Sequence, residues 1–260
     1  MVALPREGPP RSAPGSLKGI KGETAMAKRT AAVVQSLPSS AWDPLDEGRR
    51  DQSYLKTVKP RTTNQDLLMR AIDSHPLTMA LGPAGTGKTY LAVAKAVEAL
   101  TSGQIARIVI TRPVVEAGES LGFLPGDINE KMDPWMRPIY DALSDRLGAK
   151  QVRQMVKDGT VEVAPLAYMR GRTISRSFLV VDEAQNMTFM QIKMLLTRLG
   201  WHSTMVVTGD PDQSDLLPGV SGLDDAVRRL EPLEDVAIVR LGAEDIVRHP
   251  LVAAMMPLLA

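Results

Sequence analysis

The chain has 260 residues, of which 44% are hydrophobic and 23% charged, enough to form a substantial core in one or two domains. Its formal net charge is +1, which excludes a general electrostatic attraction for nucleic acid, and the lack of cysteine excludes disulfides and thiolate metal sites. No apolar run approaches the ~18 residues of a membrane helix. The N-terminus also lacks the apolar core of a secretory signal, so we expect a cytoplasmic protein without membrane contact.

Residues 1–60 differ in composition from the rest of the chain. They contain 7 of the 19 prolines and carry 10 Lys or Arg against 6 Asp or Glu, whereas residues 61–260 carry 21 against 24. Little periodic apolar pattern is present in the first stretch. We expect a disordered, mildly basic tail over residues 1–60 and one folded domain over residues 61–260.

From residue 61 onward, short apolar runs alternate with helical stretches, which is typical of an α/β fold with a parallel sheet and crossover helices. The expected elements, in chain order, are helix 63–72, strand 77–81, helix 88–100, strand 107–113, helix 128–148, strand 161–165, strand 178–182, helix 188–199, strand 204–210, helix 221–230, strand 236–241 and a short closing helix at the C-terminus.

The segment "GPAGTGKT" (82–89) lies between an expected strand and an expected helix, the context of a phosphate-binding loop. Its glycines allow successive backbone N–H groups to curl around phosphate oxygens, and the following helix directs its N-terminus at them. Lys88 is placed to reach the β- and γ-phosphates, and the Thr89 hydroxyl to ligate Mg²⁺. A chance match in a glycine-rich turn is the alternative, which the flanking elements disfavour. The predicted nucleotide-binding residues are Gly82, Pro83, Ala84, Gly85, Thr86, Gly87, Lys88, Thr89 and Tyr90.

The segment "SFLVVDEAQNM" (177–187) ends an apolar strand in two adjacent carboxylates, Asp182 and Glu183. Beside a phosphate-binding loop, Asp182 is expected to hold Mg²⁺ through its water shell, and Glu183 to deprotonate or orient the water that attacks the γ-phosphate. The alternative is a surface turn or a helix N-terminus, where negative charge is also favourable. A hydrolysing ATPase explains both acids, whereas a small-molecule kinase does not need Glu183.

Two further polar signals flank this pair. In "VVTGDPDQSDL" (206–216), Gln213 follows an apolar strand and is predicted to bond both the γ-phosphate and the attacking water; a polar loop without function is the alternative. Before the first strand, Asn64 and Gln65 stand at a spacing suited to an adenine edge, and we include them in the predicted nucleotide site.

These motifs, with "TRPVVEAGESLGFLPGDINEKMDPWMRPIYDAL", "KMLLTRLG" and "VRHPLV", resemble the PhoH family of P-loop ATPases, related to the first motor domain of superfamily-one helicases, over about residues 60–252. The resemblance implies a RecA-like three-layer sandwich with a mainly parallel central sheet, with ATP and Mg²⁺ as cofactors. It also implies ATP hydrolysis and a connection with RNA metabolism and phosphate starvation. The roles above carry over to Lys88, Thr89, Asp182, Glu183 and Gln213.

Related helicases place catalytic arginines on a second motor domain, which we do not expect in this chain. An arginine that neutralises charge on the transferred phosphoryl group would then come from a neighbouring subunit. Head-to-tail contacts of this kind close into rings. We therefore hypothesise a homo-oligomeric ring, a hexamer, with Arg248 or Arg172 as the catalytic arginine and Arg198 as an outside candidate. Each of them is otherwise an ordinary surface or salt-bridged arginine.

Single-stranded RNA is the expected partner, chiefly because of the resemblance. The stretch "YMRGRTISR" (168–176) supplies basic side chains with Tyr168 available to stack on a base, whereas Trp135 and Tyr140 fit core packing better. The leading interpretation is a Mg²⁺-dependent ATPase of RNA metabolism or helicase-like remodelling. A nucleotide-gated scaffold with slow hydrolysis and a small-molecule kinase are the alternatives.

Overall fold

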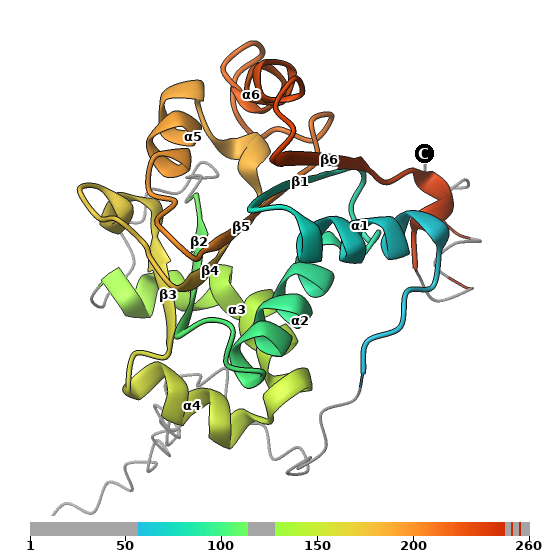
Figure 1. Cartoon of the computed structure of the whole chain (residues 1–260). Coiled ribbons are helices and arrows are strands. Elements are labelled where there is room, and N and C mark those ends of the chain that lie inside the picture. Colours follow the sequence, from blue (N-terminus) through green and yellow to red (C-terminus); the bar gives the residue numbers. More distant parts are fainter. Residues whose placement is uncertain (1–56, 114–127, 248–250, 252–254, 256–260) are drawn as a thin grey trace, which may run out of the picture. The chain divides into compact units, whose positions relative to one another are not determined.

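The chain divides into two units, Met1–Ser40 and Ala41–Ala260, and the residues that the structure describes all belong to the second. The structure is a computed structural model that describes residues 57–113, 128–247, 251 and 255, with side chains of the first turns of α3 left out (Figure 1). The predicted tail therefore lies almost wholly outside the described residues, as do most of the predicted closing helix and the Trp135 side chain.

Six parallel strands form one sheet in the order β3-β2-β4-β5-β1-β6. The strands are β1 (Leu77–Leu81), β2 (Arg107–Arg112), β3 (Val161–Pro165), β4 (Ser177–Val181), β5 (Thr204–Gly209) and β6 (Val236–Arg240). This confirms the predicted α/β class, and each described pairing in the sheet is parallel. Every residue of β1 and β4 is buried, as expected for central strands that are covered on both faces.

The helices are α1 (Thr63–Ser74), α2 (Lys88–Thr101), α3 (Ile128–Leu147), α4 (Ala149–Lys157), α5 (Phe189–Leu196) and α6 (Leu223–Leu230). Short 3₁₀ turns are η2 (Leu166–Met169), η3 (Ala184–Asn186) and η4 (Ala243–Asp245). The sequence pattern did not predict α4, whose mostly polar residues bury only Val152. Gly148, with φ 81°, separates α4 from α3 because a glycine takes this backbone conformation without steric cost.

The helices cover the sheet on both faces, which completes the predicted three-layer sandwich (Figure 1). One apolar core joins α1, α2, α3 and α4 to one face, through side chains such as Ala80, Ile110 and Val180. The second core joins α5, α6 and the turns η2 and η3 to the other face, where Met79 and Val207 point. The alternation along each strand follows from the two-residue period of side chains in a strand.

Because all strands are parallel, their carboxyl ends meet at one edge of the sheet. The chain leaves β1, β4 and β5 at this edge into the three polar segments that were predicted to form the nucleotide site. These three strands are neighbours in the order β4-β5-β1. In open α/β sheets, ligands bind in the crevice outside the carboxyl ends of the strands. The topology thus brings the three polar segments to one place.

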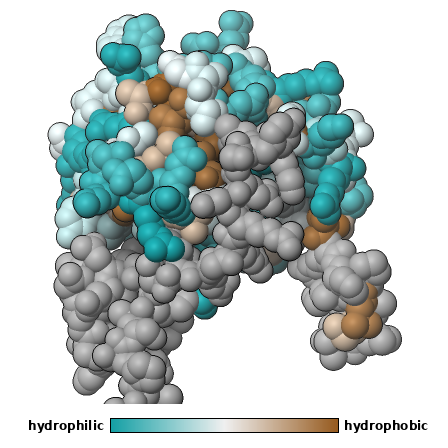
Figure 2. Space-filling model, turned by 90° about the horizontal axis from the view of Figure 1, so that it is seen from below, coloured by the Kyte–Doolittle hydropathy of each residue, from teal (hydrophilic) through white to brown (hydrophobic). Residues whose placement is uncertain are grey.

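On the face drawn in Figure 2 the described residues are mostly hydrophilic, with apolar residues in one strip and in smaller separate patches. In the part of the chain that the structure describes, none of the helices combines the length and the apolar character needed to span a membrane.

Candidate active site

A cavity of about 530 Å³ opens at the carboxyl ends of β1, β4 and β5. It brings together most of the residues that the sequence selected: Gln65, Ala84, Gly85, Gly87, Lys88, Thr89, Tyr90, Asp182, Glu183 and Gln213. Gln185, Thr208 and Asp210 also line it, although none of them was predicted as a site residue. Segments that are far apart in the chain therefore form one wall.

The loop between β1 and α2 takes conformations that favour glycine. Gly85 and Gly87 have φ of 87° and 86°, and Gly87 caps the N-terminus of α2. Gly82 also connects the loop to β5, because its N–H donates to the carbonyl of Gly209 at 3.1 Å, and its contact with phosphate stays a prediction. A Cβ at this position would lie 2.2 Å from the Leu241 carbonyl oxygen, so close packing against β6 also requires glycine.

Lys88 is the first residue of α2, directly after the loop, and is partly buried. Its Nζ donates to the carbonyl oxygens of Gly82 at 2.5 Å and Pro83 at 2.8 Å. Burial lowers the pKa of Lys88, while the negative charges of Asp210, Glu183 and Asp182 act in the opposite direction. Since carbonyl oxygens are the only partners of this amine among the described hydrogen bonds, phosphate oxygens can replace them at little cost in geometry.

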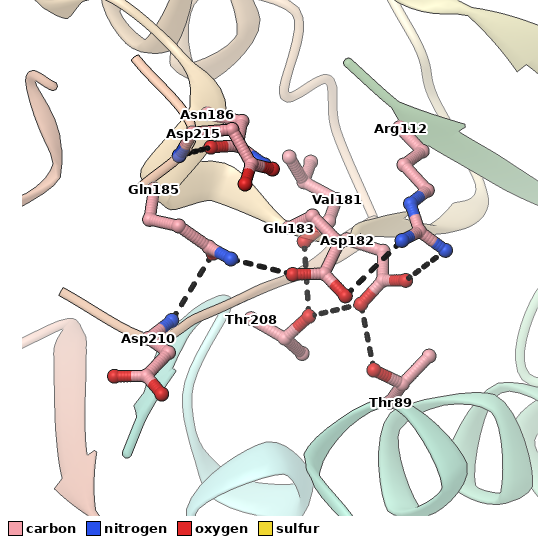
Figure 3. A network of polar contacts seen from close by, with 10 residues as sticks. All are labelled: Thr89, Arg112, Val181, Asp182, Glu183, Gln185, Asn186, Thr208, Asp210 and Asp215. Carbon is pink, nitrogen blue, oxygen red and sulfur yellow. Dashed lines mark hydrogen bonds and ion pairs between the residues drawn. The ribbon is translucent and has the colours of Figure 1, made fainter. Parts of the chain in front are cut away.

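Asp182 is 2% exposed and accepts two hydroxyl hydrogen bonds on one oxygen, Oδ1 (Figure 3). Thr89 Oγ1 donates from α2 at 2.6 Å, and Thr208 Oγ1 donates from β5 at 2.7 Å. The Thr89 hydroxyl and the Asp182 carboxylate are hard oxygen donors of the kind that Mg²⁺ prefers. No cluster of three or more His, Cys, Asp or Glu side chains with metal-site geometry occurs among the described residues, so the remaining ligands would be phosphate oxygens and water.

Glu183 follows in a left-handed backbone conformation, φ 54° and ψ 44°, which non-glycine residues adopt at a cost of ~1–3 kcal/mol and often at active sites. Both carboxylate oxygens have a donor (Figure 3). Gln185 Nε2 donates to Oε2 at 2.5 Å, and Arg112 Nη2 to Oε1 at 3.2 Å. The other end of the Gln185 amide accepts from the Asp210 N–H at 3.1 Å, which connects the ends of β4 and β5.

The segment after β5 contributes Asp210 and Gln213. Asp210 is buried, and its Oδ1 accepts from the Asp212 N–H at 3.2 Å, whereas its Oδ2 has no hydrogen-bond partner among the described residues. The Gln213 N–H donates to the Asp210 carbonyl at 3.1 Å, which closes a turn that presents Gln213 to the cavity. A Gly-Asp pair at the end of a buried strand is the sequence signal that could have identified Asp210.

The two amides proposed for the adenine edge occupy different positions. Gln65 lines the cavity, but its Nε2 donates to the Thr86 carbonyl at 3.0 Å and its Oε1 accepts from the Arg61 N–H at 2.8 Å. Asn64 donates to Asp245 Oδ2 at 2.8 Å and is not among the lining residues. In this arrangement both amides brace the protein around the loop, and their contact with adenine stays a prediction.

The arginines considered for catalysis lie apart from the cavity wall or outside the described residues. Arg172 forms a two-pronged ion pair with Glu162 of β3, at 2.5 and 2.7 Å, which raises the pKa of Arg172 and lowers the pKa of Glu162. Arg198 donates to the carbonyl of Arg172 at 3.1 Å. Arg248 lies outside the described residues. Val247, the residue before it, lines the cavity, and its N–H donates to the Gly85 carbonyl at 2.9 Å.

The parallel sheet and its phosphate-binding loop, with a hydroxyl and two carboxylates facing that loop, define a P-loop NTPase. The PhoH-like protein family model matches residues 57–260, and the chain belongs to this family. This confirms the resemblance seen in the motifs.

The relatives and solved structures that resemble the chain are longer proteins. A PhoH-like protein of Mycobacterium tuberculosis is 55% identical over 199 residues, which are 76% of this chain and 56% of that protein. Protein PhoH of Escherichia coli is 50% identical over 205 residues, 78% of this chain and 58% of that protein. The chain thus spans little more than half the length of these relatives. The structure of a large terminase from a thermophilic bacteriophage aligns with a TM-score of 0.48 and 10% identity, over 75% of this chain and 49% of that chain.

Proposed function

We propose that this chain binds ATP with Mg²⁺ and hydrolyses it to ADP and phosphate. The observation that carries the proposal is one cavity in which Lys88, Thr89, Asp182 and Glu183 face one another. The first three residues serve any nucleotide-binding loop, whereas a second acid next to Asp182 serves a reaction with water. Membership of the family supports nucleotide binding independently.

In the proposed reaction the loop binds the phosphates first. The N-terminus of α2 attracts their negative charge, and Lys88 exchanges the carbonyl oxygens of Gly82 and Pro83 for phosphate oxygens. Thr89 and Asp182 would hold Mg²⁺, which neutralises charge on the β- and γ-phosphates when it is bound. The buried hydroxyl of Thr208 keeps Asp182 in one orientation.

Glu183 then acts on water. A water oxygen attacks the γ-phosphorus, the bond between this phosphorus and the β–γ bridging oxygen breaks, and Glu183 takes the proton that the water loses. Gln213 lines the same cavity, which supports the proposal that it bonds the water and the γ-phosphate. Phosphate and ADP leave, and Glu183 returns its proton to solvent.

The test is Glu183→Gln, which keeps the shape of the side chain and removes its basicity. We expect ATP binding by calorimetry to stay within a few-fold of the original value, and turnover to fall by about 10²–10⁴, the usual contribution of a general base. Full turnover in this variant would refute the assignment. Transfer of phosphate to an added metabolite would favour a kinase, and tight binding of ATP with negligible turnover in the original protein would favour a nucleotide-gated scaffold.

We further propose that the ATPase acts on single-stranded RNA. Tyr168 is 54% exposed and lies in the segment between β3 and β4 with the exposed side chains of Arg170 and Arg176, a combination that suits base stacking and phosphate attraction. ATP turnover should rise when single-stranded RNA is added and fall again as salt is increased. Turnover that does not respond to RNA would refute this role.

A ring of identical subunits, a hexamer, completes the proposal. Arg172 or Arg248 would reach the site of the neighbouring subunit and neutralise charge on the transferred phosphoryl group. Light scattering in the presence of ATP and Mg²⁺ should then give the mass of an oligomer. A monomer with full turnover would overturn the ring.

A further inference from the structure

Arg112 is the last residue of β2 and reaches the two carboxylates of the candidate active site from the neighbouring strand. The pairing of β2 with β4 determines this position, because Thr111 pairs with Val181 and accepts from the Asp182 N–H at 2.9 Å. Arg112 Nη2 lies 3.2 Å from Glu183 Oε1, and Nη1 lies 3.8 Å from Asp182 Oδ2. Its side chain is 19% exposed, so water screens these charges only partly.

Arg112 approaches the carboxylates from behind the nucleotide cavity. It does not line that cavity, but it lines a neighbouring cavity of about 620 Å³. The two cavities share Thr89, Tyr90, Asp182 and Glu183, so the carboxylate pair stands between them. From this side the guanidinium lies against both carboxylates, while Glu183 also lines the nucleotide cavity.

The carboxylates need a cation in this position. Asp182, Glu183 and Asp210 all place negative charge around Lys88, and the phosphates of a nucleotide would add more. Adjacent like charges repel one another, and Glu183 also has a left-handed backbone that its surroundings must hold in place. Arg112 offsets the first effect and restrains the second.

We propose that Arg112 is the positioning residue of Glu183 in ATP hydrolysis, an inference that rests on the proposed function. Arg112 holds Oε1 while Gln185 holds Oε2, so the carboxylate has one orientation relative to the γ-phosphate. Each carboxylate oxygen has a further lone pair with which it can accept the attacking water. In this proposal Arg112 acts through Glu183 and from outside the nucleotide cavity, which separates its role from that of an arginine that neutralises the phosphoryl group.

The test compares Arg112→Ala and Arg112→Lys with Arg107→Ala in the complete chain. Arg107 is a matched control because it is the first residue of the same strand, at the end away from the carboxylates, and donates to Ser177 Oγ at 3.0 Å. We expect Arg112→Ala to lower kcat by roughly 10–100-fold, the scale of a misplaced catalytic group, with the Kd for ATP within about twofold in the same variant. Arg112→Lys should recover part of kcat, since lysine restores the charge but not the planar fork. Arg107→Ala should leave kcat and Kd unchanged.

A double variant distinguishes positioning from a general structural role. If Arg112 acts through Glu183, adding Arg112→Ala to Glu183→Gln should cause no further loss of turnover, whereas independent effects would multiply. Multiplied losses, unchanged kcat in Arg112→Ala, or a loss confined to ATP affinity would each overturn the inference. If Arg112→Ala lowers the melting temperature, the Arg112→Lys variant is the deciding one. An Arg112→Lys variant with the melting temperature and the kcat of the original protein would also overturn the inference. Failure of the proposed function looks different, because the original protein would then show no turnover at all.

Discussion

Replacing Gly82 by alanine tests whether this glycine serves packing, phosphate binding or both. A Cβ at position 82 would lie 2.2 Å from the Leu241 carbonyl oxygen and 3.2 Å from the Leu241 Cβ, and the backbone there has φ 135°. The obstacle is main chain of the neighbouring strand end, so a change of side-chain rotamer cannot relieve it. Either β6 must move away from β1 or the start of the loop must change.

The expected cost combines two effects. Overpacking a tight site costs about 1–3 kcal/mol, and holding a non-glycine residue in a sparsely populated backbone region costs about 1–3 kcal/mol more. The sum, roughly 2–6 kcal/mol, is a large fraction of the ~5–15 kcal/mol that stabilises a typical domain. For a domain of this size each kcal/mol lowers Tm by about 2–4 °C, so a fall of roughly 10 °C is expected. ATP affinity should fall as well, because Gly82 begins the loop and its carbonyl contacts Lys88.

Thermal unfolding followed by circular dichroism measures the first effect, and calorimetric titration with ATP the second. Gly103→Ala is the matched control, since Gly103 also has a positive φ, 75°, but a Cβ there would meet nothing within 4 Å. The control should show only the backbone cost, about 1 kcal/mol. If Gly82→Ala had the same melting temperature as Gly103→Ala and bound ATP normally, the close approach of β6 would not explain why residue 82 is a glycine.

Two further predictions concern Thr208 and Arg172. Thr208→Val removes a buried donor to Asp182 Oδ1, so it should lower the free energy of unfolding in urea by about 1.5–3 kcal/mol and raise the Mg²⁺ concentration needed for turnover. The control Thr78→Val removes a buried hydroxyl without a partner among the described residues and should be neutral or stabilising. Equal effects in the two variants would contradict the role of Thr208. Arg172→Ala should destabilise the protein by about 1 kcal/mol at pH 7. Because Arg172 lowers the pKa of Glu162, the stability that the ion pair contributes should disappear as the pH falls through that lowered pKa, below the ordinary value of 4.5. Glu162→Gln should lose the same stability. A fall in turnover confined to Arg172→Ala would therefore assign Arg172 to the active site of the neighbouring subunit. A stability difference that does not depend on pH would refute the ion-pair explanation.

Several features of the protein follow from the sequence alone because their causes are local. A buried parallel strand appears as a short continuous apolar run, and such runs predicted β1, β4 and β5 to within a residue or two at each end. The phosphate-binding loop depends on glycines at fixed spacing before a helix, all within the segment 82–89. The expected helix 128–148 agrees with α3 to within a residue, but α4 was missed, since it buries only Val152 and so has little apolar pattern to reveal it.

Only the tertiary structure decided which distant residues meet. The sheet order places β2 beside β4 and β5 between β4 and β1, so Arg112 reaches Glu183, and Thr208 reaches Asp182, across contacts that no sequence spacing encodes. The same order places β6 beside β1, so the Leu241 carbonyl oxygen leaves no room for a Cβ at position 82 and a glycine is required there. Local chemistry determined which residues are suited to phosphate, metal and water, whereas the non-sequential pairing of strands determined which side chains hold them in position.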